Sequence, residues 1–282
     1  MVNLNTLHKD KELLSHDTSN KHVNYTSKIN SCSSQCNQLT NGTIYNSKTN
    51  KPKQYISNPI NCPNNFKIFH QNVRGLANKT DELLLSVSDI NPHILCITEH
   101  HLRSEEINNI NLGQFKQGGA SIFLLNNIMY EITDLNQFNK EKDLEICVLK
   151  IKFMLTYLTV LCIYRSTSGN FSYFITQIEM VLNKLYKISS NITVCGDFNI
   201  NFLESSSKAL LLESLLYLFC LESTVDFPTR IMHTTKTLID NIFLVKKILN
   251  TITHHLINGI SDHDGQIVTL LDVTGPPQKK HL

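Results

Sequence analysis

The segment Ile192–Asn199, with the sequence ITVCGDFN, indicates the fold class of the chain. Its first four residues are almost wholly apolar, and a short strand of this composition is buried on both faces. Burial of both faces requires helices outside the sheet. Two polar side chains, Asp197 and Asn199, follow the apolar run at the strand end, where ligands collect in layered sheet proteins.

The rest of the body has the same texture of short apolar runs between turn residues. The strand pattern recurs in seven further segments: Phe66–Val73, His93–Thr98, Ala120–Leu125, Leu144–Phe153, Tyr157–Tyr164, Thr237–Val245 and Gln266–Asp272. Helical period appears in three segments: Lys79–Ile90, Phe171–Ile188 and Ser205–Phe219. This pattern predicts an α/β protein in which two packed mixed β-sheets are flanked by helices, a four-layer α/β sandwich.

Composition divides the chain into three parts. Residues 1–60 contain ten Asn and eight Ser, without an apolar period, and such a segment buries too little surface to fold. We expect a flexible Asn/Ser/Lys-rich tail at 1–65, a folded domain at 66–273 and a C-terminal tail at 274–282. No apolar run approaches the roughly 18–20 residues that cross a bilayer. We therefore expect an intracellular protein without a membrane segment or secretory signal.

Charge is distributed unevenly along the 282 residues. The chain carries 26 basic and 24 acidic residues. Residues 1–60 hold seven basic and three acidic residues, a formal charge of +4, so residues 61–282 hold 19 basic and 21 acidic residues, a formal charge of −2. A domain that binds nucleic acid through bulk charge is strongly basic, so this mode is excluded for the body. A polyanionic ligand would need a local site, with a divalent cation to offset the charge.

The eight cysteines do not indicate a disulfide scaffold. Four of them, Cys96, Cys147, Cys162 and Cys195, lie inside apolar runs, which is typical of buried thiols in a reducing compartment. Cys32 and Cys36 are spaced like half of a zinc site, but no second pair accompanies them. We interpret these two as exposed thiols, with a metal knuckle as the weaker alternative.

Polar residues also stand at the ends of other predicted strands, namely Asn72, Glu99 and Tyr164. Each has a structural alternative, since a carboxylate after a strand is more often a turn former than a ligand. Asp240 interrupts an apolar strand, and a buried charge of this kind needs a partner. His263 is the candidate partner.

Two histidine doublets have a second interpretation. His100 with His101, and His254 with His255, could each be a metal site or a pair of surface side chains. We predict that both doublets are exposed.

The ordered set of polar motifs resembles the endonuclease/exonuclease/phosphatase family. The nearest likeness is to the apurinic-endonuclease-like endonuclease domain of non-LTR retrotransposons, and it spans about residues 66–273. The resemblance is carried by these segments together: Gln71–Leu76 with Lys79, Ile97–Glu99, Tyr164–Arg165, Gly196–Asn199, Phe227–Arg230, Leu238–Ile242 and Ser261–His263.

The resemblance implies a role for each matching residue. The implied metal ligands, for Mg²⁺ with Mn²⁺ as an alternative ion, are Asn72, Glu99 and Asp262. The implied catalytic residues are Tyr164, Asp197, Asn199, Asp240 and His263. In this scheme, Asp197 orients or deprotonates the attacking water, and Asp240 fixes the tautomer of His263. The implied phosphate or DNA contacts are Arg74, Arg165, Thr229 and Arg230.

The resemblance further implies hydrolysis of a DNA phosphodiester to leave a 3′ hydroxyl and a 5′ phosphate. In the retrotransposon branch, this nick primes reverse transcription, so the implied partners are DNA and a reverse transcriptase of the same element. We expect a monomer. A nuclear location fits this role, although no compact basic run marks one.

The chain departs from the family pattern between Glu99 and Gly118. Only 18 residues separate them, and the shortened segment 100–118 reads as though a strand were missing, which would expose a sheet edge. A catalytically impaired, degenerate copy is therefore one alternative. Two others stay open on separate grounds: a phosphatase, because the same fold serves phosphatases, and a nucleic-acid-binding module that uses the Lys-bearing tail without chemistry.

Overall fold

The computed structural model describes residues 65–102, 113–117, 119–124, 128–153, 156–245 and 250–271. Of the tail predicted at 1–65, all but Asn65 lies outside the described residues, and so does the tail predicted at 274–282. Cys32 and Cys36 also fall outside them. No helix within the described ranges is long and apolar enough to cross a membrane.

The first sheet has six strands in the order β13-β14-β1-β2-β4-β3. Within it, β1 and β2 run parallel, and the other neighbours are antiparallel. Its strands are β1 (Asn65–Asn72), β2 (Ile94–Thr98), β3 (Gly113–Gln117), β4 (Ala120–Leu124), β13 (Thr251–Leu256) and β14 (Gly265–Leu271).

The second sheet also has six strands, in the order β5-β6-β7-β8-β12-β9. Here β7 and β8 are the parallel pair. Its strands are β5 (Tyr130–Ile132), β6 (Glu145–Phe153), β7 (Thr156–Tyr164), β8 (Ile192–Asp197), β9 (Leu221–Ser223) and β12 (Asp240–Val245). A separate hairpin joins β10 (Arg230–Met232) to β11 (Thr235–Thr237), and a short 3₁₀ helix covers Asn136–Phe138.

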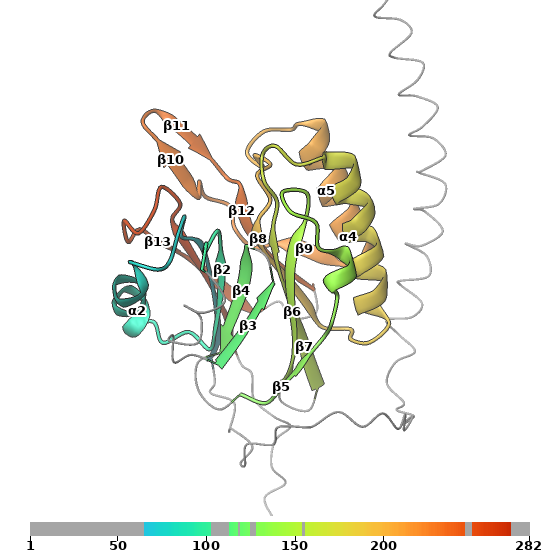
Figure 1. The fold of residues 1–282 in the computed structure, drawn as a ribbon, viewed down its shortest axis with the longest axis horizontal. Helices are drawn as coiled ribbons and strands as arrows, with labels where there is room; N and C mark the ends of the chain where they lie inside the picture. Colours follow the sequence, from blue (N-terminus) through green and yellow to red (C-terminus); the bar gives the residue numbers. More distant parts are fainter. Residues whose placement is uncertain are drawn as a thin grey trace, which may run out of the picture. The chain divides into compact units, whose positions relative to one another are not determined.

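Helices cover the outer faces of both sheets (Figure 1). Helix α2 (Thr80–Ser88) packs on the first sheet, and α4 (Phe171–Tyr186) and α5 (Ser207–Leu218) cover the second. The side chains of Asn170 and Ser206 accept hydrogen bonds from the first turns of α4 and α5, which fixes where these helices begin. The predicted arrangement of two mixed sheets flanked by helices is confirmed.

A continuous apolar core fills the space between the two sheets. All six residues of β8 are buried, as its composition predicts. Cys96, Cys162 and Cys195 are fully buried free thiols in this core, and Cys147 is buried beside them. The prediction of buried, reduced core cysteines is confirmed for these four positions.

The segment that follows Glu99 does not lack its strand. Residues Gly113–Gln117 form β3, which pairs with β4 along five residues and makes the edge of the first sheet. The prediction that a strand is missing from 100–118 is therefore wrong. The pattern hid this strand because GQFKQ contains a single large apolar residue.

The predicted exposure of the first histidine doublet is wrong for one member. His100 is buried, with 1% of its surface exposed, and its Nδ1 accepts a hydrogen bond from the backbone of Leu102. The flanking Glu99 and His101 both have left-handed backbone, with φ of +50° and +52°, and this turns His100 inward. In the second doublet His254 is exposed, whereas His255 is half-buried against Asp264.

Close contact between β7 and β8 explains the glycine of the GDFN motif. A Cβ on Gly196, whose φ is +151°, would lie 1.9 Å from the carbonyl oxygen of Ile163. Backbone cannot move aside there without breaking the parallel pairing of the two strands.

We predict that Gly196→Ala lowers the free energy of unfolding by about 3 kcal/mol or more, through this clash. Gly259→Ala is the matched control, because its φ is +70° but no atom lies within 4 Å of the added Cβ. The control should cost only the about 1–2 kcal/mol of left-handed backbone. Urea unfolding measures both, and equal losses would contradict the proposed clash.

Candidate active site

Five of the predicted site residues lie at one end of the two packed sheets. In the first sheet Asn72, the last residue of β1, is in register with Thr98, so Glu99 directly follows this edge. In the second sheet Asp197, the last residue of β8, is in register with Tyr164 of β7 and Asp240 of β12. Asp240 was predicted to interrupt an apolar strand, but it is instead the first residue of β12.

Asp197 connects the two sheets through hydrogen bonds. Asn72 Nδ2 donates to Asp197 Oδ2 over 2.8 Å. On the other side, the backbone N–H of Asn199 donates to Asp197 Oδ1 over 2.9 Å, and its side-chain Nδ2 lies 3.3 Å from Oδ2. Asn199 has a φ of +50°, a left-handed conformation that asparagine tolerates. The carboxylate is therefore held by three donors although it is fully buried.

The electrostatics of Asp197 are set by burial and by a second carboxylate. Burial raises its pKa, the neighbouring charge of Asp240 raises it further, and the result is a pKa of about 8. His263 and the hydrogen bond from Asn72 act in the opposite direction. Asp197 is thus poised to bind or release a proton near neutral pH.

His263 and Asp240 form a buried pair. His263 Nδ1 donates to Asp240 Oδ2 over 2.8 Å, since an ionised carboxylate can only accept. The hydroxyl of Thr229 donates to the same oxygen over 2.8 Å. Burial by itself lowers the pKa of His263, but Asp240 outweighs this effect and raises it to about 9. The imidazole is therefore cationic at neutral pH.

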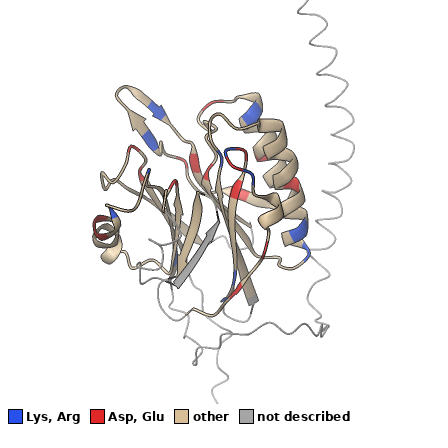
Figure 2. Ribbon diagram, in the orientation of Figure 1, with Lys and Arg blue, Asp and Glu red and all other residues tan. Residues whose placement is uncertain are grey.

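A chain of ion pairs lies beside this pair. Arg74 Nη1 donates to both oxygens of Asp262, at 2.9 and 3.0 Å, and its Nε lies 3.6 Å from Glu99. Arg230 Nε donates to Asp262 over 2.7 Å. Burial on its own raises the pKa of Asp262, but the arginines and His263 lower it. Figure 2 shows acidic and basic residues near the strand ends and basic residues on the β10–β11 hairpin.

Tyr164 belongs to the same end of the second sheet. Its side chain is half-buried, and burial, followed by a hydrogen bond with Glu99, raises the pKa of its hydroxyl above the usual range. The phenol therefore stays protonated and can donate a hydrogen bond at any physiological pH.

Two residues predicted to contact phosphate or DNA do not face a ligand. Arg165 is 2% exposed, and its guanidinium donates to backbone carbonyls, including those of Phe198 at 2.8 Å and Asn199 at 2.9 Å. Thr229 is fully buried, and its hydroxyl donates a hydrogen bond to Asp240. In this structure each side chain instead makes its hydrogen bonds inside the protein, where it holds a residue of the site.

Two supporting residues were not predicted. Gln71 Nε2 donates to the backbone carbonyl of His263 over 2.8 Å, and the hydroxyl of Ser261 donates to the carbonyl of Asn72 over 2.6 Å. Together they fix the loop that carries His263. The sequence offered one signal for Gln71: it is a polar residue directly before Asn72 at the end of an apolar strand. Because neighbours in a strand point to opposite faces, Gln71 and Asn72 place polar groups on both faces of the sheet.

The site offers oxygen ligands that suit a hard divalent cation. Asp197 and Asp240 each present a carboxylate oxygen within 4.8 Å of the other and of His263; the cationic ring of His263 itself has no lone pair for a metal ion. Oδ1 of Asp240 is buried and has no hydrogen-bond partner among the described residues, so a cation would satisfy it. Of the predicted metal ligands, Asn72 contacts Asp197, whereas Glu99 and Asp262 both contact Arg74. These donors fit a cation such as Mg²⁺.

Comparison with solved structures identifies the fold. The chain is similar to the endonuclease domain of TRAS1, a telomere-specific non-LTR retrotransposon, with a TM-score of 0.61 and 16% identity over 74% of this chain and 100% of that one. It is also similar to D. rerio TDP2 complexed with a single-strand DNA product, with a TM-score of 0.56 and 15% identity over 73% of this chain and 99% of that one.

An AP endonuclease from Archaeoglobus fulgidus has a TM-score of 0.55 and 15% identity over 72% of this chain and 98% of that one. No protein-family model and no curated protein matches the sequence. The chain has the endonuclease/exonuclease/phosphatase fold, as its motifs predicted.

Removal of the Asp240 charge should change the titration of His263. In Asp240→Asn, burial is opposed only by Asp197 and Asp262, so the pKa of His263 should fall from about 9 toward its ordinary value near 6.5. NMR titration of the imidazole measures this. Asp264→Asn, which removes the carboxylate beside His255, should shift the His263 pKa by less than about one unit. A His263 pKa that stays near 9 in Asp240→Asn would contradict the assigned pairing.

Proposed function

We propose that the chain is a divalent-metal-dependent phosphodiesterase that nicks DNA and leaves a 3′ hydroxyl and a 5′ phosphate. The observation that carries the proposal is the convergence of Asp197, Asp240 and His263 at one end of two sheets that have the endonuclease/exonuclease/phosphatase fold. Each member has a partner that fixes its orientation, as a catalytic group requires.

His263 and Tyr164 supply positive charge and a hydrogen bond to the scissile phosphate. The Nδ1 proton of His263 is engaged by Asp240, which leaves Nε2–H of the cationic ring to face a phosphate oxygen. Tyr164 remains a neutral donor because its pKa is raised. Both groups stabilise the negative charge that grows on the phosphate during attack.

Asp197 acts on the attacking water. Asn72 and Asn199 hold its carboxylate in one orientation, and its pKa of about 8 suits a group that accepts a proton near neutral pH. In this scheme the side-chain amide of Asn199 also donates to the substrate phosphate, in exchange for one of its hydrogen bonds to Arg165 and Asp197. The water loses its proton to Asp197 as its oxygen attacks phosphorus.

The residues that would hold the cation are Asn72, Glu99 and Asp262, with Mg²⁺ the expected ion and Mn²⁺ an alternative. When bound, the ion supplies Lewis-acid stabilisation of a phosphate oxygen and of the departing 3′ oxygen.

DNA fits the charge pattern better than a small phosphate ester does. Arg74 and Arg230 are partly exposed cations beside the site, on the loop after β1 and on the β10–β11 hairpin. They offer a local contact to the backbone of a polymer although the body is not basic. A reverse transcriptase of the same element, which would extend the 3′ hydroxyl, and a nuclear location belong to the same proposal.

A plasmid-nicking assay with Mg²⁺ tests this function. We expect nicking by the unmodified protein and a loss of at least about 100-fold in rate for Asp197→Asn and for His263→Gln. His254→Gln and Asp89→Asn, which change exposed residues, are the matched controls and should nick normally.

A folded protein that does not nick, or site variants that nick as fast as the controls, would refute the proposal. Release of inorganic phosphate from a phosphomonoester without nicking would instead identify a phosphatase.

Arg74 should compete with the cation, because its guanidinium contacts both Glu99 and Asp262. We predict that Arg74→Ala tightens Mn²⁺ binding by about fivefold, since the loss of a partly exposed ion pair is worth up to about 1 kcal/mol. Electron paramagnetic resonance of free Mn²⁺ measures the change. Lys187→Ala at the end of α4 removes a distant positive charge and should have no effect. Weaker binding in Arg74→Ala would contradict the predicted competition.

A further inference from the structure

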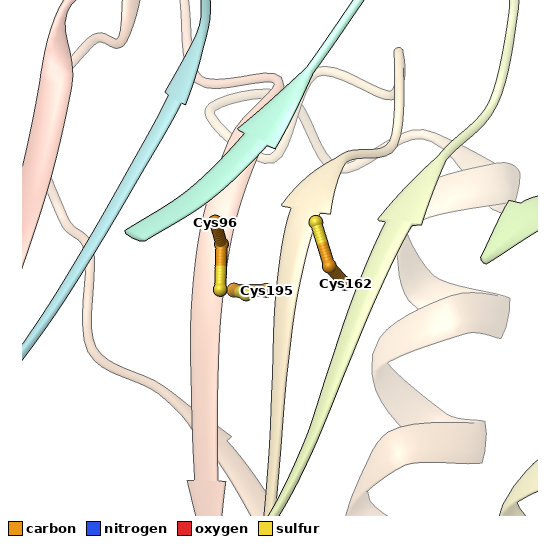
Figure 3. Close-up of side chains that lie close together, drawn as sticks. All are labelled: Cys96, Cys162 and Cys195. Carbon is orange, nitrogen blue, oxygen red and sulfur yellow. The ribbon is translucent and has the colours of Figure 1, made fainter. Parts of the chain in front are cut away.

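Three cysteine side chains converge inside the core, each two residues before the end of its strand and so directly below the strand-end site. Cys96 comes from β2, Cys162 from β7 and Cys195 from β8 (Figure 3). All three are fully buried. Their sulfur atoms all lie within 4.8 Å of one another. The cluster therefore joins one strand of the first sheet to two strands of the second.

Strand register brings the three sulfurs together. Cys162 and Cys195 are register partners in the parallel pair β7–β8, so their side chains leave the same face of the sheet. Cys96 belongs to the opposing sheet and packs into the same core between the sheets. This alignment of three thiols on neighbouring elements was not required by packing alone, because any apolar residue of similar size would fill these positions.

A histidine lies on the same side of the first sheet. His70 of β1 is the register partner of Cys96 and is fully buried. Its Nδ1 is 2.7 Å from Gln266, whereas its Nε2 has only a 3.3 Å contact with the hydroxyl of Thr98. His70 is also close enough to Cys162 to influence the pKa of that thiol. His70 does not belong to the group of side chains whose ligand atoms lie within 4.8 Å of one another, so its ring would have to move toward the sulfurs to bind the same ion.

We propose that Cys96, Cys162 and Cys195 bind a Zn²⁺ ion, with His70 as the fourth ligand. Three cysteines and one histidine are one of the sets that hold structural zinc in tetrahedral geometry. Sulfurs bound at about 2.3 Å from zinc lie about 3.8 Å apart, so the cluster needs at most about 1 Å of contraction. The thiolate donors separate this site from the oxygen-rich site at the strand ends, which suits Mg²⁺.

The ion would tie the two sheets together and change the protonation of the core. Burial raises the pKa of the Cys96 and Cys162 thiols, so they are protonated without an ion. A bound zinc ion deprotonates its thiol ligands outright: at Cys96 and Cys162 each Zn–S bond replaces an S–H bond, and the proton leaves to solvent. Burial by itself raises the pKa of Cys195, but hydrogen bonds with the other two thiols lower it to about 6, so this ligand has less of a proton to lose. Binding therefore weakens as the pH falls.

Cobalt substitution tests the site. The full chain, stripped with a chelator under reducing conditions, is refolded with one equivalent of Co²⁺, because ligands from both sheets favour loading during folding. We expect one Co²⁺ per chain, a thiolate-to-cobalt charge-transfer band, and loss of the band when Zn²⁺ displaces Co²⁺. Zinc at about 100 times its Kd should raise Tm by roughly 5–10 °C.

Variants assign the band to individual residues. Cys162→Ala should abolish it. The matched control is Cys147→Ala, because Cys147 is the register partner of Cys162 on β6 and is buried in the same core but does not belong to the cluster. His70→Gln should weaken Co²⁺ binding and shift the ligand-field bands without removing the thiolate band. Asp197→Asn should leave the thiolate band unchanged.

The result that overturns the proposal needs no variant. If the unmodified chain regains its native circular dichroism with Co²⁺ present but shows no thiolate-to-cobalt band, the cysteines do not bind metal. Equal loss of the band in Cys147→Ala and Cys162→Ala, with both variants folded by circular dichroism, would also refute the assigned cluster.

Discussion

The site depends on one constraint, which is that two aspartates occupy facing positions of neighbouring strands. Asp197 and Asp240 are register partners, and neither side chain is exposed. Like charges directly opposite each other destabilise a sheet, and burial makes the repulsion stronger. The fold tolerates the pair only because donors surround it: Asn72, Asn199, Thr229 and the cationic ring of His263.

The same compensation gives the site its chemistry. Asn72 comes from the first sheet, so its hydrogen bond to Asp197 also sets how the two sheets meet at this end. Because Asp240 holds His263 in its protonated form, a positive charge stands beside the carboxylates without an added ion. Asp197 has a raised pKa because it is buried and because Asp240 is its neighbour. Stability and reactivity are therefore set by the same contacts.

Much of the fold followed from local patterns. The period of the apolar residues located the eight predicted strands and three helices, because those elements bury a continuous face. The strands that were missed are short or lie at edges, such as β3 and the hairpin β10–β11, where few apolar residues mark the pattern. Likewise, the ordered motifs located the residues at the strand ends.

Side-chain direction could not be predicted from these motifs. Arg165 and Thr229 stand next to site residues in the sequence patterns, but contacts with distant segments, such as that of Thr229 with Asp240, turn them inward. His100 looked like a surface residue until the left-handed backbone on either side was known. The clustering of Cys96 with Cys162 and Cys195 likewise depends on how two sheets face each other, which no local pattern contains.

A double-mutant cycle on Asp240 and His263 tests the central claim most directly. The free energy of unfolding is measured at neutral pH for the unmodified protein, Asp240→Asn, His263→Gln and the double variant. If the buried pair compensates the two facing carboxylates, the coupling energy should be at least about 2 kcal/mol. Additive single effects, with a coupling energy near zero, would contradict the account.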